Sequence, residues 1–273
     1  MSEVKGRVAK TFDDWASWYD DRFGGWMKYS TNMVLNEFKI PENPTCLDVA
    51  CGTGVSTFEL MKACGNKGKF YGIDISRNMI EAAKNIAPER GLGNVEFMLG
   101  DAERIDFPDA SFDLVLCNMS LHFFPDKPKA LAEMARVLKR GGQFAFTYAG
   151  KPAWQEIYKI VSTVMMRHPD LPGLRRAVAD TIDWPLSLEE SIDLLEGAGL
   201  KISNIYERRA IDFSDPGFIV SESCSAWNYW RQETPTHMVD TIKSELLSGA
   251  REAASPRGFK HTSITIFAWG TKP

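Results

Sequence analysis

The chain has 273 residues, of which 44% are hydrophobic and 25% are charged. This composition is typical of a globular protein that buries a sizeable core. The formal net charge of −4 gives no electrostatic attraction to nucleic acid or to an acidic membrane. A protein that binds such partners through a basic surface is therefore not expected.

The N-terminal segment and the cysteines indicate the compartment. Residues 1–21 carry charges throughout and lack the apolar centre of a signal peptide. Uncharged stretches such as 114–125 are shorter than the roughly 20 residues of a membrane helix. Five cysteines, an odd number, suit reduced thiols, and Cys46 and Cys51 lack the spacing of a zinc site. We expect a cytoplasmic protein without a metal site.

Strands and helices alternate regularly through the first half of the chain. Aromatic residues near helical spacing predict two helices within 8–38. Ser76 is a candidate N-cap, and Gly141-Gly142 is expected to stop a helix. The pattern predicts strands at 45–50, 69–75, 95–100, 112–119 and 143–149, and helices at 55–64, 76–87 and 127–138.

The second half departs from this rhythm. The pattern there predicts helical stretches at 151–184, 187–199 and 215–258, and strands at 200–210 and 262–270. Strands that alternate with helices favour a parallel sheet covered on both faces. We therefore expect an α/β protein with a seven-stranded, Rossmann-like, mostly parallel sheet.

The stretch CLDVACGTGVS, residues 46–56, places a glycine-rich turn directly after a strand that carries Asp48. Such a turn before a helix is where an α/β sheet usually binds a nucleotide. A dinucleotide site would need Gly-x-Gly-x-x-Gly. Aligned on Gly52, the flanking positions are Ala50 and Val55, which makes NAD binding a weak alternative.

Two further acids lie at matching places. Asp48, Asp74 and Asp101 are 26 and 27 residues apart, each at the end of a predicted strand. The carboxyl ends of parallel strands meet at one edge of the sheet, where open α/β sheets bind ligands. Three acids in register with a glycine turn therefore predict one cofactor site.

These motifs resemble a known family. LDVACGTG resembles the first motif of class I S-adenosylmethionine-dependent methyltransferases, with Ala50 in place of the usual first glycine. YGIDIS and GDAERIDFPDASFD resemble the second and third motifs, so that the resemblance covers 45–148. TFDDWASWYDD resembles the N-terminal helix of the subfamily that includes ubiquinone/menaquinone C-methyltransferases and many small-molecule methyltransferases. The implied cofactor is S-adenosyl-L-methionine, with S-adenosyl-L-homocysteine as product.

The resemblance also implies roles for single residues. Asp74 is placed to accept hydrogen bonds from the ribose hydroxyls, and Asp101 is placed to accept one from the adenine amino group. Ala102 is placed to offer its backbone N–H to the adenine ring. Tyr19 is placed to close over the methionine end of the cofactor. The expected cofactor-binding residues are Tyr19, Asp48, Ala50, Gly52, Gly54, Asp74, Ile75, Met79, Asp101, Ala102, Glu103 and Asn118.

The acceptor side is less defined. His122 follows the fourth strand and is either a catalytic base or a structural residue of the turn. Among the N-terminal aromatics, Phe12, Trp15 and Trp26 are expected in the core, and the candidates for a lid are Tyr19, Phe23 and Tyr29. The candidate acceptor-binding residues, which could equally be packing residues, are Phe23, Tyr29, Trp184, Trp227 and Tyr229.

We expect a single methyltransferase domain over 1–273, with a helical lid at 1–40 and a cofactor-binding core at 41–150. Insertions at 151–185 and 215–258 are expected to form an acceptor cap.

The expected function is methyl transfer to a small, largely apolar acceptor enclosed by lid and cap. One alternative is C-methylation of a quinone or another prenylated ring. An alternative of a different class is a non-catalytic protein that binds S-adenosylmethionine. No nucleic acid and no integral membrane association are expected.

Overall fold

The computed structural model describes residues 2–222 and 224–273. Contacts divide the chain into two compact units. Unit 1 consists of 1–148, 188–207 and 266–273; unit 2 consists of 149–187 and 208–265. The expectation that the whole chain behaves as one domain with a lid and a cap stays a prediction.

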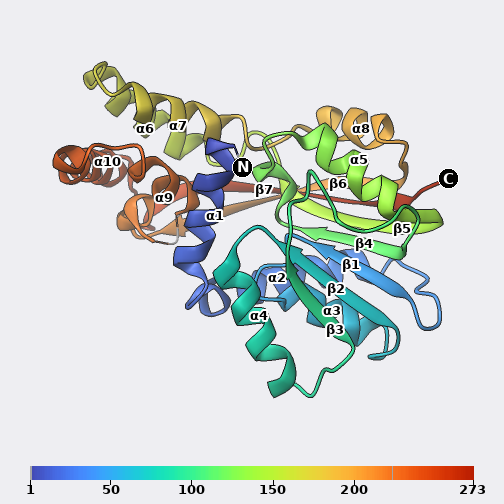
Figure 1. The fold of residues 1–273 in the computed structure, drawn as a ribbon. Coiled ribbons are helices and arrows are strands. Elements are labelled where there is room, and N and C mark those ends of the chain that lie inside the picture. The colour runs from blue at the N-terminus through green and yellow to red at the C-terminus, as the bar shows by residue number, and fades with distance from the viewer. Residues whose placement is uncertain (1, 223) are drawn as a thin grey trace. The chain divides into compact units, whose positions relative to one another are not determined.

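In the described residues one sheet has seven strands, in the order β3-β2-β1-β4-β5-β7-β6 (Figure 1). The pairs β1–β2, β2–β3, β1–β4 and β4–β5 are parallel. The strands are β1 Thr45–Val49, β2 Lys69–Asp74, β3 Val95–Leu99, β4 Phe112–Asn118, β5 Leu138–Ala149, β6 Lys201–Ser214 and β7 Phe259–Thr271. The strand order reverses beside β1, so the ends of β1 and β4 border the crevice where such sheets bind ligands.

Unit 1 also contains the helices that connect these strands. They are α1 Glu3–Trp15, α2 Tyr19–Leu35, α3 Val55–Ala63, α4 Arg77–Glu89, α5 Lys127–Val137 and α8 Leu188–Gly197, with the short 3₁₀ helix η1 Leu121–Phe123. Ser76 is the N-cap of α4, and its hydroxyl accepts a hydrogen bond from the backbone N–H of Met79 at 3.2 Å. The alternation and this cap are as predicted.

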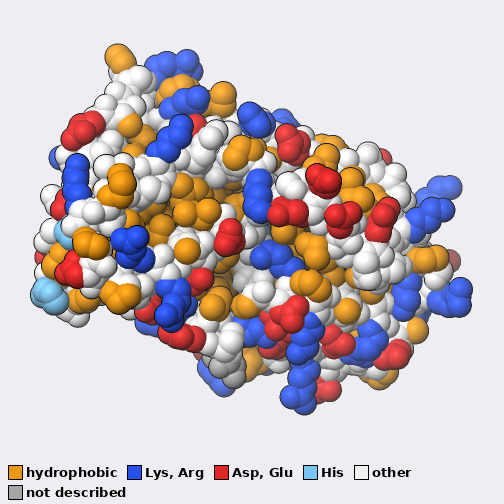
Figure 2. Space-filling model, turned by 90° about the horizontal axis from the view of Figure 1, so that it is seen from above, with side chains coloured by type: hydrophobic (Ala, Val, Ile, Leu, Met, Phe, Trp, Pro, Cys, Tyr) orange, Lys and Arg blue, Asp and Glu red, His pale blue; other side chains and the backbone are white. Residues whose placement is uncertain are grey.

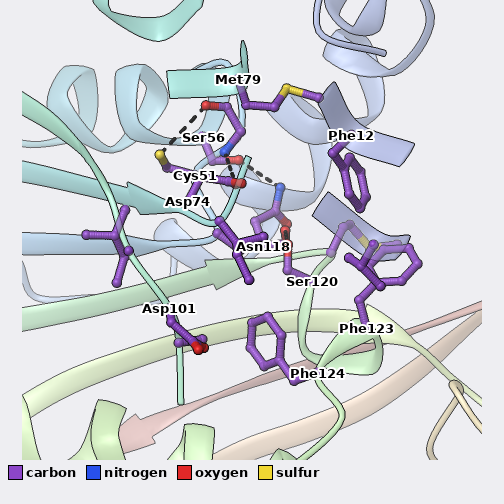
Figure 3. A pocket seen from close by; sticks show the side chains of 18 of the residues that line it. Phe12, Cys51, Ser56, Asp74, Met79, Asp101, Asn118, Ser120, Phe123 and Phe124 are labelled. Carbon is purple, nitrogen blue, oxygen red and sulfur yellow. Dashed lines mark hydrogen bonds between the residues drawn. The ribbon is translucent and has the colours of Figure 1, made fainter. Parts of the chain in front are cut away.

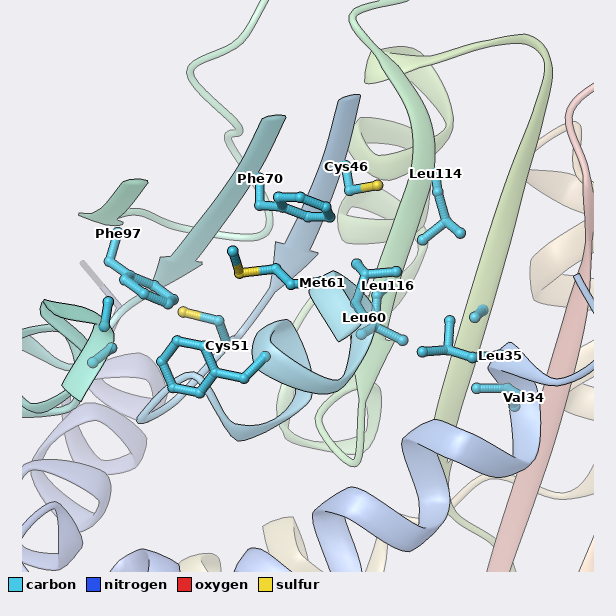
Figure 4. Packing of buried hydrophobic residues seen from close by; sticks show 14 of the residues in the cluster. Val34, Leu35, Cys46, Cys51, Leu60, Met61, Phe70, Phe97, Leu114 and Leu116 are labelled. Atoms are coloured by element: carbon cyan, nitrogen blue, oxygen red, sulfur yellow. The ribbon is translucent and has the colours of Figure 1, made fainter. Parts of the chain in front are cut away.

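Helices cover both faces of the sheet in unit 1. Figure 1 shows α2, α3 and α4 on one face, and α5 and α8 on the other. On the first face, Leu60 and Met61 of α3 pack with Val34 and Leu35 of α2 and with Phe70 of β2 (Figure 4). All five side chains are buried. This apolar layer holds the ends of β1 and β2 in place.

Unit 2 holds the remaining helices. They are α6 Gln155–Arg167, α7 Pro172–Ile182, α9 Ser225–Arg231 and α10 Val239–Ala253, with the 3₁₀ helices η2 Pro216–Val220 and η3 Thr236–Met238. Their aromatic side chains are joined by hydrogen bonds: the Trp230 indole donates to the Thr181 hydroxyl at 2.9 Å, and the Tyr158 hydroxyl donates to the Thr181 carbonyl at 2.6 Å. Unit 2 therefore has a packed interior of its own.

The predicted stop at Gly141-Gly142 is wrong. Helix α5 already ends at Val137, and the two glycines lie inside β5. Gly141 donates its N–H to the Lys272 carbonyl at 2.7 Å, and Gly142 accepts from the Lys272 N–H at 2.9 Å. Gly141 adopts a left-handed φ of 75° within the strand, and backbone pairing with the C-terminal segment keeps both glycines in β5.

Trp26 is a second correction. It was expected in the core, but 36% of the side chain is exposed, and its ring stacks on Tyr29 at 5.3 Å between centroids. Trp15 is buried, as predicted. Within the described residues, no helix combines the length and the apolar character needed to cross a membrane.

Candidate functional site

The turn after β1 is built on left-handed backbone. Ala50, Gly52 and Gly54 have φ of 58°, 55° and 88°. Ala50 therefore adopts the conformation that the missing first glycine would supply. At Gly54, the N-cap of α3, a Cβ would lie 2.9 Å from the Phe97 ring and 3.0 Å from the Phe58 ring. Only glycine fits there without displacing a ring.

Asp74 joins this turn to the next one. One carboxylate oxygen accepts the Gly52 N–H at 2.8 Å (Figure 3). The other accepts the Ser76 N–H at 2.8 Å. Burial raises the pKa of Asp74 to about 6, although these backbone hydrogen bonds favour the ionised form. The carboxylate thus fixes the ends of β1 and β2 against each other.

A pocket opens beside these two turns. It has about 880 Å³ of empty space, with open solvent at its mouth included. The predicted cofactor residues that line it are Tyr19, Ala50, Gly52, Asp74, Ile75, Met79, Asp101, Ala102, Glu103 and Asn118. Acids that follow two different strands, β2 and β3, are thus brought to one site.

Asp48 and Gly54 are not among the lining residues. Asp48 is 1% exposed, and one of its oxygens accepts the Thr57 hydroxyl at 2.6 Å. Burial raises the pKa of Asp48 to about 7. The other oxygen accepts no hydrogen bond within the described part of the chain. Asp48 and Gly54 therefore support the backbone of the turn without lining the pocket.

Asn118 lines the pocket and anchors helix α2. Its side-chain N–H₂ donates to the Ser56 hydroxyl at 2.9 Å and to the Met27 carbonyl at 3.2 Å. Its oxygen accepts from the hydroxyls of Ser30, at 2.9 Å, and Thr147. Asn118 therefore holds α2 and α3 to the ends of β4 and β5.

The apolar wall of the pocket comes from α1, α2 and the η1 region. Phe12 and Phe123 meet edge to face at 5.3 Å between ring centroids, and both line the pocket (Figure 3). Phe12 was expected to be a core residue; it is a wall of the site instead. The other apolar lining residues in this wall are Val8, Tyr19, Met27, Met119, Phe124 and Pro125.

Tyr19 is a half-buried, neutral phenol. Burial raises its pKa, and the charges of Asp74 and Asp20 act in the same direction. Phe23 packs on the Tyr19 ring at 5.2 Å, and Tyr29 stacks on Trp26. Neither Phe23 nor Tyr29 is a lining residue. The structure therefore brings Tyr19 alone of the three lid candidates into the pocket wall.

His122 lies in η1, next to the pocket but not in its lining. It is 2% exposed, and its ring packs on Phe123 at 4.0 Å between centroids. Burial, with a contribution from Lys127, lowers the pKa of His122 to about 3. The ring is therefore neutral near pH 7.

The other acceptor candidates lie in unit 2. Trp184, Trp227 and Tyr229 are all buried, and Trp184 meets Tyr229 edge to face at 5.0 Å. The Tyr229 hydroxyl donates to Asp180 at 3.0 Å. These contacts favour the packing interpretation of the three residues.

Sequence reasoning missed Lys5. It lies on α1 and lines the pocket, with Nζ 2.6 Å from Asp101 and 2.6 Å from Glu103. A lysine in an amphipathic terminal helix resembles a solvent-exposed residue, and its partners are almost a hundred positions away in the sequence. The only available signal was the pair of acids near the end of the third strand.

Comparisons with known proteins identify the family of the chain. A family model described as "Methyltransferase domain" matches residues 40–182. Aklanonic acid methyltransferase DauC of Streptomyces sp. strain C5 is 35% identical over 211 residues, which cover 72% of this chain and 93% of that protein.

Two further relatives extend the comparison. The ubiquinone/menaquinone biosynthesis C-methyltransferase UbiE of Hahella chejuensis is 30% identical over 220 residues, covering 76% of this chain and 88% of that protein. Among solved structures, the YcgJ protein of Bacillus subtilis has a similar fold, with a TM-score of 0.63, 23% identity, and coverage of 89% of this chain and 98% of that one.

The chain therefore belongs to the S-adenosylmethionine-dependent methyltransferases. The predicted fold class, enzyme class and cofactor are confirmed. The residues fit this cofactor, because Asp74 and Asp101 in the pocket lining carry carboxylates that can accept hydroxyl and amino donors. When bound, S-adenosylmethionine supplies a methyl group carried on a positively charged sulfur.

Proposed function

We propose that Asp74 accepts the two ribose hydroxyls and that Asp101 and Ala102 hold the adenine. Each Asp74 oxygen already accepts one backbone N–H. A carboxylate has about four acceptor sites, so one remains on each oxygen for a hydroxyl. Asp101 and Ala102 line the same pocket on the loop after β3, and this supports placing the base there.

We propose that the methyl acceptor is a small, largely apolar molecule. The observation that carries this proposal is the aromatic wall of Phe12, Tyr19, Phe123 and Phe124 in the same pocket as the acids. Two relatives are named for aklanonic acid and for ubiquinone/menaquinone, which agrees with an acceptor built on a carbon ring system.

The chain's own residues then have two tasks in the transfer, alignment and exclusion of water. Asn118 fixes α2, and thereby Met27, at the pocket. Phe12 and Phe123 close against each other at the wall. The neutral Tyr19 phenol adds a polar hydroxyl to this wall. These contacts support transfer by positioning rather than by chemistry of the side chains.

The test is turnover with a panel of acceptors. The protein is incubated with S-adenosylmethionine and, in turn, an aromatic polyketide acid, a prenylated naphthoquinol in detergent and an RNA. We expect S-adenosylhomocysteine and a singly methylated product, detected by mass spectrometry, with an apolar ring compound and none with RNA. Preference for the prenylated ring would support the C-methyltransferase alternative, whereas binding without turnover on any acceptor would support a non-catalytic binder.

The exclusion of nucleic acid remains part of this proposal. Basic and acidic side chains are interspersed over the face shown in Figure 2, without a continuous basic stripe, and the net charge is −4. We infer a cytoplasmic enzyme for a small molecule. Salt-sensitive micromolar binding of RNA in a filter assay would overturn this inference. Contact of the acceptor with Phe23, Tyr29, Trp184, Trp227 or Tyr229 stays a prediction.

We infer a structural role for His122. A base with a pKa near 3 that does not reach the pocket is poorly suited to accept the acceptor's proton. His122→Asn is therefore expected to lower kcat by no more than about tenfold, whereas a general base would lose about 10²–10⁴-fold. Steady-state rates with an active acceptor measure this, and a loss in the larger range would restore His122 as the base.

The affinity for the cofactor should depend on pH through Asp74. Its pKa of about 6 means that the carboxyl is protonated below that pH. An ionised carboxylate is the stronger acceptor for two hydroxyls, so binding must then release the proton. Affinity should fall by up to about tenfold for each pH unit below 6.

Calorimetry with S-adenosylhomocysteine from pH 4.5 to 8 measures this dependence. Asp74→Asn, which cannot titrate, should bind more weakly and give a flatter profile. An equally steep profile in Asp74→Asn would assign the dependence to another group, of which Asp48 with its pKa near 7 is the nearest candidate.

A further inference from the structure

Lys5 introduces a positive charge into a pocket that is expected to bind a cation. Its Nζ lies 2.6 Å from Asp101 Oδ2 and 2.6 Å from Glu103 Oε2. Nothing in the transfer reaction requires this ammonium group. Its position between two carboxylates on the loop after β3 therefore calls for a role of its own.

The contact is partly enclosed. The side chains of Lys5 and Glu103 are 12% and 10% exposed, and that of Asp101 is 37% exposed. Burial lowers the pKa of Lys5, but its hydrogen bonds to Asp101 and Glu103 outweigh burial, and the net pKa is raised. The ammonium is therefore charged throughout the neutral range. Water and salt screen this ion pair less than they screen a fully exposed surface pair.

Both oxygens of the Asp101 carboxylate, and both of the Glu103 carboxylate, have a bonding partner. Asp101 Oδ1 accepts the Glu103 N–H at 2.9 Å, and Glu103 Oε1 accepts the Asp126 N–H at 3.0 Å. Lys5 binds the remaining oxygen of each. Removing the ammonium would leave two neighbouring carboxylates without a counter-charge, and Asp101 would lose one of its two anchors.

Helix α1 is fixed at a second place. Asp13 accepts the Ser76 hydroxyl at 2.6 Å and the Asn78 N–H at 3.0 Å. Ser76 directly precedes α4 and also donates its N–H to Asp74. Helix α1 is thus tied to the Asp74 turn by Asp13 and to the Asp101 loop by Lys5.

We propose that Lys5 is a positioning residue for the base of the cofactor: it orients the Asp101 carboxylate toward the adenine amino group and ties α1 to that side of the pocket. The inference rests on the placement of adenine at Asp101 proposed above. Asp101 retains enough exposed surface to accept a further donor. Lys5 would therefore contribute to selection of an amino-bearing base over one with an oxo group.

The test compares two ligands by calorimetry. S-adenosylhomocysteine carries the adenine amino group, and S-inosylhomocysteine carries an oxo group in its place. Lys5→Met is expected to raise Kd for the first ligand about 5- to 30-fold and for the second less than about threefold. Lys5→Arg should recover most of the loss. Lys10→Met is the matched control, because Lys10 lies on the same helix, exposed, and pairs with Asp14 at 3.2 Å.

The Lys5→Met change is also made in the Asp101→Asn variant, to distinguish positioning of Asp101 from a general loosening of α1. In Asp101→Asn, the Lys5→Met change should alter Kd for S-adenosylhomocysteine by less than about twofold, because the Asp101 carboxylate that Lys5 orients is no longer present. Equal weakening of both ligands, or an undiminished effect in Asp101→Asn, would overturn the positioning role. Failure of the wild-type protein to bind S-adenosylhomocysteine would instead overturn the placement of the cofactor.

Discussion

Replacing Asp74 with alanine is expected to weaken binding of S-adenosylhomocysteine about 10- to 150-fold. The change removes the acceptor for two ribose hydroxyls, and hydrogen bonds to a charged group contribute about 1.5–3 kcal/mol. It also releases the backbone N–H groups of Gly52 and Ser76, which the carboxylate now accepts at 2.8 Å each. Both turns of the site should therefore become less ordered.

The measurement is titration calorimetry at pH 7.5, with thermal unfolding recorded in parallel. Asp109→Ala is the control, because it removes a carboxylate that is 78% exposed and pairs with Arg136 away from the pocket lining. It should bind like the wild type. Unchanged affinity in Asp74→Ala would remove Asp74 from the ribose role.

Replacing Gly54 with alanine is expected to destabilise the fold by about 2–5 kcal/mol. A φ of 88° costs an L-residue roughly 1–2 kcal/mol, and overlap in a packed region adds about 1–3 kcal/mol. The overlap is specific: the new Cβ would meet the rings of Phe97 and Phe58 at 2.9 and 3.0 Å.

Gly52→Ala is the matched control in the same turn. Its φ of 55° is close to that of Ala50 at 58°, and its Cβ would meet nothing nearer than the Met79 sulfur at 4.0 Å. Urea unfolding should give a loss of about 1–2 kcal/mol for Gly52→Ala, from backbone strain alone. Equal losses in the two variants would show that the Phe97 contact does not limit position 54.

The sheet and the register of the acids could be predicted from sequence because they depend on local signals. Apolar runs bounded by glycine and helix-cap residues define β1 to β4, and Asp74 and Asp101 fall at or just beyond the ends of β2 and β3. Ser76 caps α4 for the same local reason: its own hydroxyl meets an N–H three residues on.

Other features depend on tertiary contacts that no local pattern records. Lys5 finds its partners 96 and 98 positions along the chain. The Gly141-Gly142 pair is held in β5 by backbone bonds to Lys272. His122 has the sequence context of a base, but its surroundings bury it. Phe12 follows a core-like stripe, yet the pocket lies directly beside it.

A crystal structure of the protein with S-adenosylhomocysteine tests the central claim most directly, namely that the pocket beside the β1 turn holds the cofactor. We expect the ribose hydroxyls within hydrogen-bonding distance of Asp74 and the adenine beside Asp101 and Ala102. The sulfur should lie toward the wall formed by Phe12 and Phe123. Ligand density elsewhere in the protein, with this pocket empty, would contradict the account.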